Sequence, residues 1–245
     1  MRELKGLKEL KELTGSTSQG NGMEITWLGH SCFRLRSRAA TVVTDPYGKD
    51  LGLALPRVRA DIVTISRDVD DHNYVKGVKG DFKVLSGPGE YEVSGVFVTG
   101  LVLSDRKATG KSAKGSGAAL ARNTVFLIEF DDLAVCHLGD LDSVPTQAMV
   151  EESLSAVDVL LIPVGGGESL NAAQAAEVVS LLEPHVVIPM HYKSRGASLK
   201  LDPVSKFLKE MGLDKVDEQE ALKLDRSGLP DETQVALLEL KSKDE

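Results

Sequence analysis

The sequence predicts an α/β protein in which two β-sheets pack against each other and helices lie on the outside. The chain has 245 residues, of which 42% are hydrophobic and 27% are charged, values that suit a globular domain. From Met23 onwards, short runs rich in Val, Ile, Thr and Phe dominate, which is typical of strands. Helical periodicity appears only in the second half, between further strand-like runs. Strands first and mixed elements later predict two packed sheets with outer helices.

The predicted strands of the first half are separated by Gly, Pro or Asp, which interrupt regular structure. In chain order these runs are EITWLGHSCFRLR, TVVTDPY, ADIVTIS, FKVLSGPGEYEV, GVFVTGLVL, NTVFLIEF and LAVCHLGD. Because they follow one another with little between them, this part of the chain is predicted to build sheet rather than helix.

The second half alternates predicted helices with strands. Ser143 can cap a helix that runs through QAMVEESL, and Asn171 can cap AAQAAEVVSLLE, which stops before Pro184. A third helix is predicted from Pro203 to Met211, ended by Gly212. The remaining predicted strands are VDVLLIPV, HVVIPMHY and a last strand, TQVALLEL. The first two are apolar along most of their length, so we expect them to be buried.

Two segments depart from this pattern. In residues 1–22, leucines recur at every third position (Leu4–Leu13) and predict a short amphipathic helix, followed by the linker-like GSTSQGNG. We therefore expect a flexible N-terminal extension and then one domain, residues 23–245. Residues 104–123, SDRKATGKSAKGSGAALARN, lack periodicity and are locally basic. They are predicted to form either a solvated loop or a flap that attracts an anionic substrate.

Charge, hydropathy and cysteine content argue against several classes of protein. The net charge of -8 and the few aromatic residues disfavour a general nucleic-acid-binding protein. No apolar run approaches the ~20 residues that span a bilayer, and the charged N-terminus lacks the apolar core of a signal peptide. Two cysteines, Cys32 and Cys136, are too few for a disulfide framework. We therefore predict a cytoplasmic protein without a membrane partner.

Side chains capable of chemistry cluster where the predicted strands end. His72 follows Asp71, His137 lies shortly before Asp140, and His191 ends an apolar strand. A strand that ends in a turn presents its last side chains at the rim of a sheet, and several such rims together form a pocket. Imidazole and carboxylate groups are a ligand mix that suits zinc, iron or manganese. These residues therefore predict a metal site.

Seven segments follow one another in a characteristic order: WLGHSCFRL, VVTDPY, ADIVTISRDVDDHNYV, GPGEYEVSGVFVTG, VCHLGDLDS, DVLLIPVGG and VVIPMHY. In this order they resemble the metallo-β-lactamase superfamily, and more narrowly its branch of zinc-dependent hydrolases. The similarity covers about residues 23–212. It implies a four-layer αββα sandwich, the metallo-β-lactamase fold.

The chain departs from the superfamily at the T-H-x-H-x-D-H metal motif, where it has S-R-D-V-D-D-H. Arg67 and Val69 replace the first pair of histidines. No histidine occurs between His72 and His137, so a third ligand of the same metal site is missing too. The second site is complete by the resemblance, with the ligands Asp71, His72, Asp140 and His191. The resemblance therefore implies at most one ion per chain, zinc or else manganese or iron.

The resemblance also implies roles around this site. Asp71 or Asp140 would orient a water molecule and accept its proton. His30 is expected to line the pocket rather than to bind metal, and Asp45 to orient a ligand from behind. His137 is predicted to be a buried structural histidine.

The sequence also predicts where the side chains of Arg67 and His185 lie. Arg67 either points to solvent or places its guanidinium where the first ion is missing and pairs with Asp140 or Asp71, which would otherwise carry uncompensated charge. His185 follows Pro184 at the entry to a strand and is predicted to be a surface residue.

Two functions follow from the sequence. The first is a metal-dependent hydrolase with a reduced site, in which metal-activated water attacks an ester, a lactone or a phosphodiester in a small, anionic or neutral substrate. The second is a catalytically inactive, metal-free binding or scaffold protein in which Arg67 replaces the first metal. Fold does not choose among these substrates, and metal analysis separates the two functions.

Overall fold

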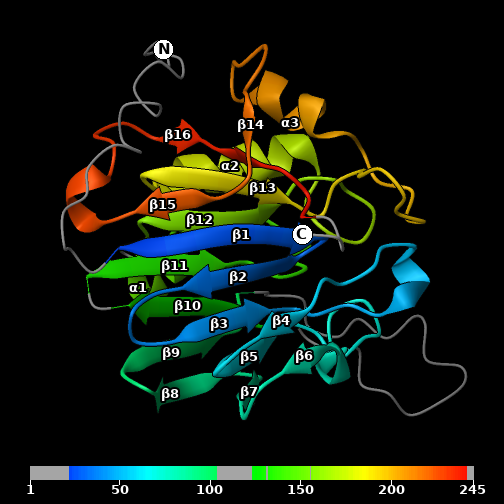
Figure 1. Ribbon diagram of the computed structural model, residues 1–245. Helices are drawn as coiled ribbons and strands as arrows, with labels where there is room; N and C mark the ends of the chain where they lie inside the picture. The colour runs from blue at the N-terminus through cyan, green and yellow to red at the C-terminus, as the bar shows by residue number, and fades with distance from the viewer. Residues whose placement is uncertain (1–21, 104–122, 131, 155, 242–245) are drawn as a thin grey trace, which may run out of the picture.

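The computed structural model describes residues 22–103, 123–130, 132–154 and 156–241 (Figure 1). The predictions for the N-terminal extension and for the loop at 104–123 lie outside the described residues, apart from Gly22 and Asn123. Within these ranges no helix combines the length and the apolar composition that crossing a membrane requires.

Strands dominate the described part of the chain. The strands are β1 (Met23–Gly29), β2 (Cys32–Arg36), β3 (Thr41–Thr44), β4 (Val58–Arg59), β5 (Ile62–Ile65), β6 (Val78–Lys79), β7 (Lys83–Ser86), β8 (Gly89–Val93), β9 (Val96–Leu101), β10 (Val125–Phe130), β11 (Leu133–His137), β12 (Val159–Pro163), β13 (Val186–Met190), β14 (Glu218–Gln219), β15 (Leu222–Leu224), β16 (Gln234–Val235) and β17 (Leu237–Leu238). The α-helices are α1 (Gln147–Ser153), α2 (Ala172–Leu182) and α3 (Val204–Glu210).

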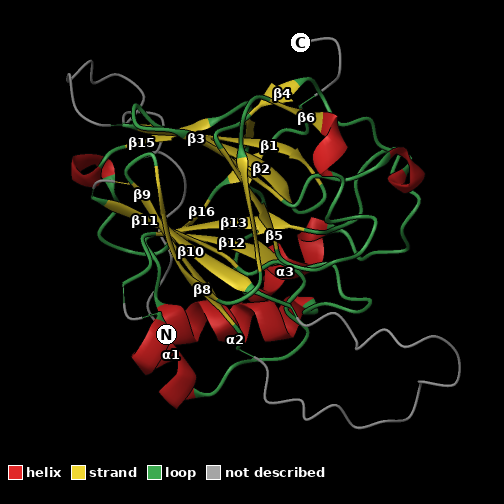
Figure 2. Cartoon of the chain, turned by 90° about the horizontal axis from the view of Figure 1, so that it is seen from below, coloured by secondary structure: helices red, strands yellow, loops and turns green. Residues whose placement is uncertain are grey.

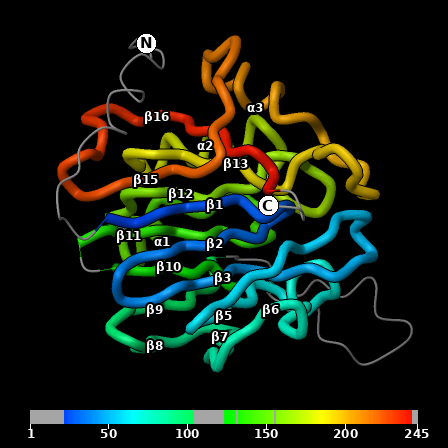
Figure 3. The backbone as a smooth tube through the Cα atoms, in the orientation of Figure 1, coloured from blue at the N-terminus to red at the C-terminus, as the bar shows by residue number. Residues whose placement is uncertain are grey.

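Two sheets form the body of the molecule. The first has the strand order β15-β1-β2-β3-β5-β7 and the second has the order β16-β13-β12-β11-β10-β9-β8. The β1–β2–β3 and β8–β9–β10–β11 pairings are antiparallel, whereas β3–β5–β7 and β11–β12–β13–β16 pair in parallel. Strands β7 and β8 follow each other along the chain but are edge strands of different sheets (Figure 3). The predicted class, an α/β protein with two large sheets, is confirmed.

The main core lies between the sheets. Ile25 and Phe33 of the first sheet and Phe126 and Ile128 of the second belong to one apolar cluster and are fully buried. Helices α1, α2 and α3 lie together beyond the second sheet (Figure 2). Because they cover its outer face, β12 and β13 are buried along their whole length, as their apolar sequences predict.

The outer face of the first sheet is covered differently. Leu28, Val43 and Val63 point away from the main core and pack in a second cluster with Tyr47 and Leu51. The covering segments carry 3-10 turns at 49–51 and 75–77 and the short β4–β6 ladder, and none of the described residues there forms an α-helix (Figure 2). This layer therefore consists of turns and loops, whereas the helices gather on the opposite side.

Two local predictions differ from the structure. Helix α1 is capped by Thr146, whose hydroxyl accepts from the backbone N–H of Met149, whereas the hydroxyl of Ser143 donates to Asp142. The predicted last strand is divided into β16, which joins the second sheet, and β17, which pairs with β14. The prediction for α2 is confirmed: Asn171 caps it in a reciprocal capping box, worth about 1 kcal/mol.

Candidate metal centre

Polar side chains gather at one edge of the sandwich, where several strands end. Contacts between them bring the two sheets together there: Arg67, which follows β5, reaches Asp140, which follows β11. The gathered residues are His30 in the β1–β2 turn, Asp45 after β3, Arg67, Asp71 and His72 after β5, Asp140 after β11, and His191 after β13. The sequence predicts each of them as a site residue.

Three of these residues have a left-handed backbone. The φ angle is 52° at His30, 37° at Asp45 and 51° at His191, and only Ser94 and Glu183 share this feature among the described non-glycine residues. A positive φ is uncommon for a residue with a side chain and costs of order 1 kcal/mol. It persists where the surrounding structure holds it, and such residues concentrate at functional sites. The strand ends therefore turn sharply to aim these side chains at one another.

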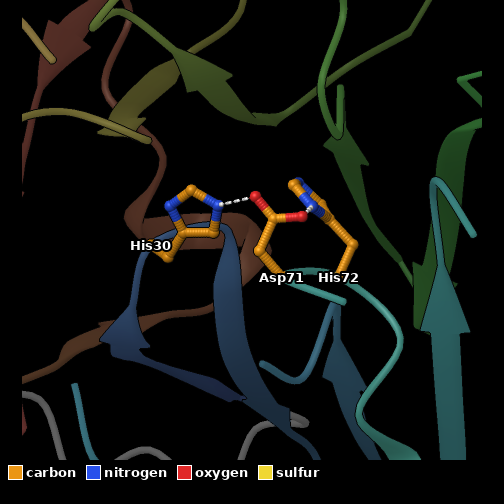
Figure 4. A group of neighbouring side chains, drawn as sticks. All are labelled: His30, Asp71 and His72. Atoms are coloured by element: carbon orange, nitrogen blue, oxygen red, sulfur yellow. Dashed lines mark hydrogen bonds and ion pairs between the residues drawn. The ribbon is translucent and has the colours of Figure 1, made fainter. Parts of the chain in front are cut away.

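His30, Asp71 and His72 form the tightest group (Figure 4). The carboxylate of Asp71 lies between the two rings, with Oδ2 3.5 Å from His30 Nε2 and Oδ1 3.0 Å from His72 Nδ1. Each residue offers a ligand atom, and these three atoms lie within 4.8 Å of one another. Two ligand atoms at ~2.1 Å from one zinc ion are at most ~4.2 Å apart, so small side-chain shifts would let all three reach an ion.

His191 is held by Ser169. The hydroxyl of Ser169 donates to the carbonyl oxygen of Gly166 at 3.1 Å, and its oxygen lies 2.9 Å from His191 Nδ1. Because that single hydroxyl proton is already donated, Nδ1 carries the ring proton and Ser169 accepts it. The lone pair of the ring is then at Nε2, which faces Asp140 Oδ1 at 3.7 Å. Ser169 therefore fixes His191 in the tautomer that suits metal binding through Nε2.

Arg67 points into the site rather than to solvent. Its side chain is 19% exposed, and Nη1 lies 2.5 Å from Asp140 Oδ2 and 3.3 Å from Glu168 Oε2. Asp140 is 6% exposed, whereas Glu168 is 82% exposed, so the contact with Asp140 is the drier of the two. One oxygen of Asp140 thus faces a guanidinium and the other faces an imidazole. This contact agrees with the prediction that the guanidinium of Arg67 lies where the first ion is missing and pairs with Asp140.

Asp45 and His137 form the floor of the site, and both are fully buried. The oxygens of Asp45 accept hydrogen bonds from the backbone N–H of Ser66 (2.7 Å) and from its hydroxyl (2.5 Å). Asp45 Oδ2 is 3.8 Å from His72 Nε2 and 4.0 Å from His137 Nδ1, beyond hydrogen-bond range. Asp45 therefore anchors the start of the motif loop directly and acts on the rings only through its charge. His137 Nε2 bonds the carbonyl oxygen of Ser31 at 2.9 Å.

Charge and unsatisfied atoms both suit a cation at this site. His30 Nε2, His72 Nε2 and Asp140 Oδ1 are buried and have no hydrogen-bond partner in the described part of the chain. An unpaired buried polar atom costs roughly 1–3 kcal/mol, which a metal ligand bond would offset. The carboxylates of Asp45, Asp71 and Asp140 outnumber the guanidinium of Arg67. The residues present therefore fit one divalent ion.

Ionisation differs among the side chains of the site. Burial, reinforced by the neighbouring His30, lowers the pKa of His191 to about 3, so its ring is neutral at pH 7. Burial likewise lowers the pKa of His30. Burial also opposes a charge on His72, but Asp45 and the other carboxylates outweigh it and raise the pKa of His72. Burial disfavours the charged form of Asp71, yet the neighbouring rings of His30 and His72 hold its pKa well below the usual range.

The sequence did not single out Ser169 and Glu168, which support His191 and Arg67. They follow a glycine run, Gly165–Gly167, directly after β12. A Cβ at Gly165 would lie 2.2 Å from the carbonyl oxygen of His191, so this loop needs glycine to approach the site. A glycine run between a buried strand and a polar pair is the signal that could have identified them.

One predicted histidine lies outside the site. The side chain of His185 is 40% exposed, its Nδ1 is 2.7 Å from the carbonyl oxygen of Pro230, and its Nε2 is 4.0 Å from Asp158 Oδ1. It is therefore a partly exposed residue, close to its prediction.

Comparison with known proteins points in the same direction. The family model of the beta-lactamase superfamily domain matches residues 24–191. A solved structure from Thermotoga maritima, described as a candidate Zn-dependent hydrolase of the metallo-beta-lactamase superfamily, is 38% identical with a TM-score of 0.70, and the match covers 88% of this chain and 98% of that chain. These similarities confirm the metallo-β-lactamase fold that the sequence predicts.

Curated relatives are more distant. A UPF0173 metal-dependent hydrolase from Methanosarcina barkeri is 29% identical over 211 residues, 74% of this chain and 88% of the relative. One from Pyrococcus horikoshii is 28% identical over 154 residues, which are 62% of this chain and 66% of the relative.

Proposed function

Because this chain belongs to the β-lactamase superfamily, we propose that it is a metal-dependent hydrolase with a reduced, one-ion site. The proposed ligands are Asp71, His72, Asp140 and His191. The names of the relatives from Methanosarcina barkeri and Pyrococcus horikoshii support a metal-dependent hydrolase. Zinc is the proposed ion, with manganese or iron as alternatives, since imidazole and carboxylate ligands suit all three.

The observation that carries the proposal is the division of Asp140 between two partners. Oδ2 pairs with the guanidinium of Arg67, whereas Oδ1 is buried, unpaired and 3.7 Å from His191 Nε2. A guanidinium is a fixed cation that needs no further ligands. On the Oδ2 side of Asp140, the positive charge is supplied by Arg67. On the Oδ1 side, ligand atoms face one another without a cation. This division supports one ion per chain.

The residues around the ion have separate tasks in the proposed reaction. A bound divalent ion polarises the substrate and makes a water molecule acidic near neutral pH. Asp71, with a half-buried, ionised carboxylate whose side chain is 32% exposed, can orient that water and accept its proton. Asp140 is held between Arg67 and His191, so it fixes the positions of the neighbouring side chains. It is the second candidate to accept the proton of the water molecule.

Arg67 supports an anionic substrate. Its two contacts with carboxylates both use Nη1, and 19% of its side chain remains exposed beside the ion site. A guanidinium has five N–H donors in a planar fork that matches phosphate and carboxylate groups. We therefore place a phosphodiester, or an ester or lactone with a neighbouring anionic group, as the substrate class.

Metal analysis with a substrate panel tests the proposal. Protein purified without chelator should carry one transition-metal ion per chain and should hydrolyse a phosphodiester faster than a neutral ester of equal leaving group. His191→Ala should abolish metal binding, whereas the matched control His185→Ala should not. Two ions per chain would contradict the one-ion site.

The second function, a metal-free binding or scaffold protein, is favoured by the same short Arg67–Asp140 contact, because the guanidinium already neutralises part of the site. A protein that carries no ion, and whose melting temperature does not respond to zinc, manganese or iron, would support this alternative.

A further inference from the structure

We propose that His30, in the turn between β1 and β2, is a direct ligand of the ion together with Asp71 and His72. This inference rests on the proposed metal-dependent function, but it changes the ligand set that the sequence predicts, in which His30 only lines the pocket. The site would then have three imidazoles. One of them, that of His30, comes from the β1–β2 turn and not from the metal motif after β5.

The distances place His30 at the centre of the histidines. Its ring centroid is 4.3 Å from that of His191 and 5.1 Å from that of His72, whereas the last two are 6.2 Å apart. The two histidines that the sequence predicts as ligands are thus the most widely separated pair. The compact ligand group in the structure consists of His30, Asp71 and His72 (Figure 4).

The ring of His30 also has a free, buried ligand atom. Its Nε2 has no hydrogen-bond partner in the described part of the chain and lies 3.5 Å from Asp71 Oδ2, too far for a good hydrogen bond. The residue is only 4% exposed, so water does not readily satisfy this nitrogen. A lining residue gains nothing from such an arrangement, whereas a metal ligand requires an unpaired nitrogen aimed at the ion.

The turn that carries His30 is built to hold the ring in place. The backbone has φ 112° at Gly29 and φ 52° at His30. The carbonyl oxygen of His30 accepts two hydrogen bonds, from Trp27 Nε1 at 2.9 Å and from the backbone N–H of His191 at 3.2 Å. The second bond ties the turn to β13, so that His30 and His191 keep a fixed relation. A strained conformation with this support is typical of functional positions.

The chemistry explains why a third imidazole is useful here. Arg67 and Val69 stand where the metal motif has histidines and cannot act as ligands. Arg67 also occupies one oxygen of Asp140, which weakens that carboxylate as a ligand. His30 supplies a neutral nitrogen donor in compensation, and a site with three histidines and an open position is a known catalytic arrangement for zinc.

Metal affinity tests this inference without reference to activity. We would measure the zinc affinity of the purified, metal-free chain by competition with a chromophoric chelator. His30→Gly is the informative variant because glycine accepts the left-handed backbone and removes only the ring. We expect its zinc affinity to fall by about 100-fold or more, beyond the ~10- to 100-fold loss typical of residues that merely support a ligand. The matched control, His185→Ala, should keep the affinity of the parent.

Cobalt spectroscopy provides a direct test of ligation. In His30→Cys, a thiolate at this position should add a sulfur-to-cobalt charge-transfer band to the spectrum of the Co²⁺ complex. The parent should lack this band, because Cys32 and Cys136 are fully buried in the two apolar clusters.

The outcomes separate this inference from the proposed function. In a parent that binds zinc, a loss of affinity in His30→Gly no larger than the ~10- to 100-fold typical of supporting residues would overturn ligation by His30 and leave the metal-dependent function standing. A Co²⁺ complex of His30→Cys without the band would do the same. A parent chain that binds neither zinc nor cobalt would overturn both.

Discussion

Removal of the Arg67 side chain should destabilise the fold and make it more responsive to metal. In the parent, Nη1 of Arg67 lies 2.5 Å from Asp140 Oδ2, and Asp140 is 6% exposed. Breaking a fully buried ion pair by removing one partner costs roughly 3–5 kcal/mol, because the other charge stays buried and unpaired. Arg67 is 19% exposed, so water can enter the space that it leaves, and we expect Arg67→Ala to cost about 2 kcal/mol.

The loss should appear as a lower melting temperature that divalent ions partly restore. For a chain of this size, about 2 kcal/mol corresponds to a decrease of roughly 4–8 °C. An ion that binds only the folded state at 100 times its Kd adds about 2.7 kcal/mol of stability. The variant exposes both oxygens of Asp140 to the ion, so zinc or manganese should raise its melting temperature more than that of the parent.

A second ion pair provides the matched control. Arg226 Nη1 lies 2.6 Å from Asp158 Oδ1, and Asp158 is 8% exposed. Among the described residues one histidine, His185, lies near this pair, with Nε2 4.0 Å from Asp158 Oδ1, so the pair has no metal-binding cluster around it. Arg226→Ala should therefore lower the melting temperature without changing the response to metal. The reasoning is refuted if Arg67→Ala matches the parent in both melting temperature and metal response, because the guanidinium would then not replace a cation.

Three further predictions concern the same site. Ser169→Ala removes the group that fixes the His191 tautomer and should weaken zinc binding by about 10- to 100-fold, measured by chelator competition. Ser169→Thr should restore the affinity, because it keeps the hydroxyl. Equal zinc affinities in the parent and both variants would contradict this role of Ser169. Combining Arg67→His with Val69→His restores the first histidine pair of the motif and should raise the metal content above that of the parent in elemental analysis. Gly165→Ala places a Cβ 2.2 Å from the carbonyl oxygen of His191 and should cost about 3 kcal/mol in denaturant unfolding, so a parent-like midpoint would show that this loop moves freely.

The sequence predicts the two sheets well because hydrophobic patterns report burial directly. The runs that form β12 and β13 are apolar throughout, and both strands are buried on both faces. The outer face of the first sheet could not be predicted in this way. Its cover includes Tyr47 and Leu51, which lie in turns and loops, where apolar residues recur without a regular period.

The residues of the site were predicted better than their arrangement. Sequence order predicts Asp71, His72 and His191 just after apolar strands, and the structure brings them close together after β5 and β13. The central position of His30 depends on a left-handed turn and on the hydrogen bond between two strands that are distant in the sequence. Likewise, the role of Ser169 depends on where a glycine loop folds back. Neither contact leaves a local pattern in the chain.

The left-handed backbone at three strand ends has a consequence for substitutions far from the site. His30, Asp45 and His191 keep their backbone conformation only while the sheet edge around them stays firm. A substitution within β1, β3 or β13 that lowers the local stability of these strand ends should let the turns relax towards ordinary φ values. The side chains of the site would then lose their relative positions, while most strands remain paired. By the same reasoning, heating the metal-free chain should disperse this cluster of side chains before the sandwich itself melts.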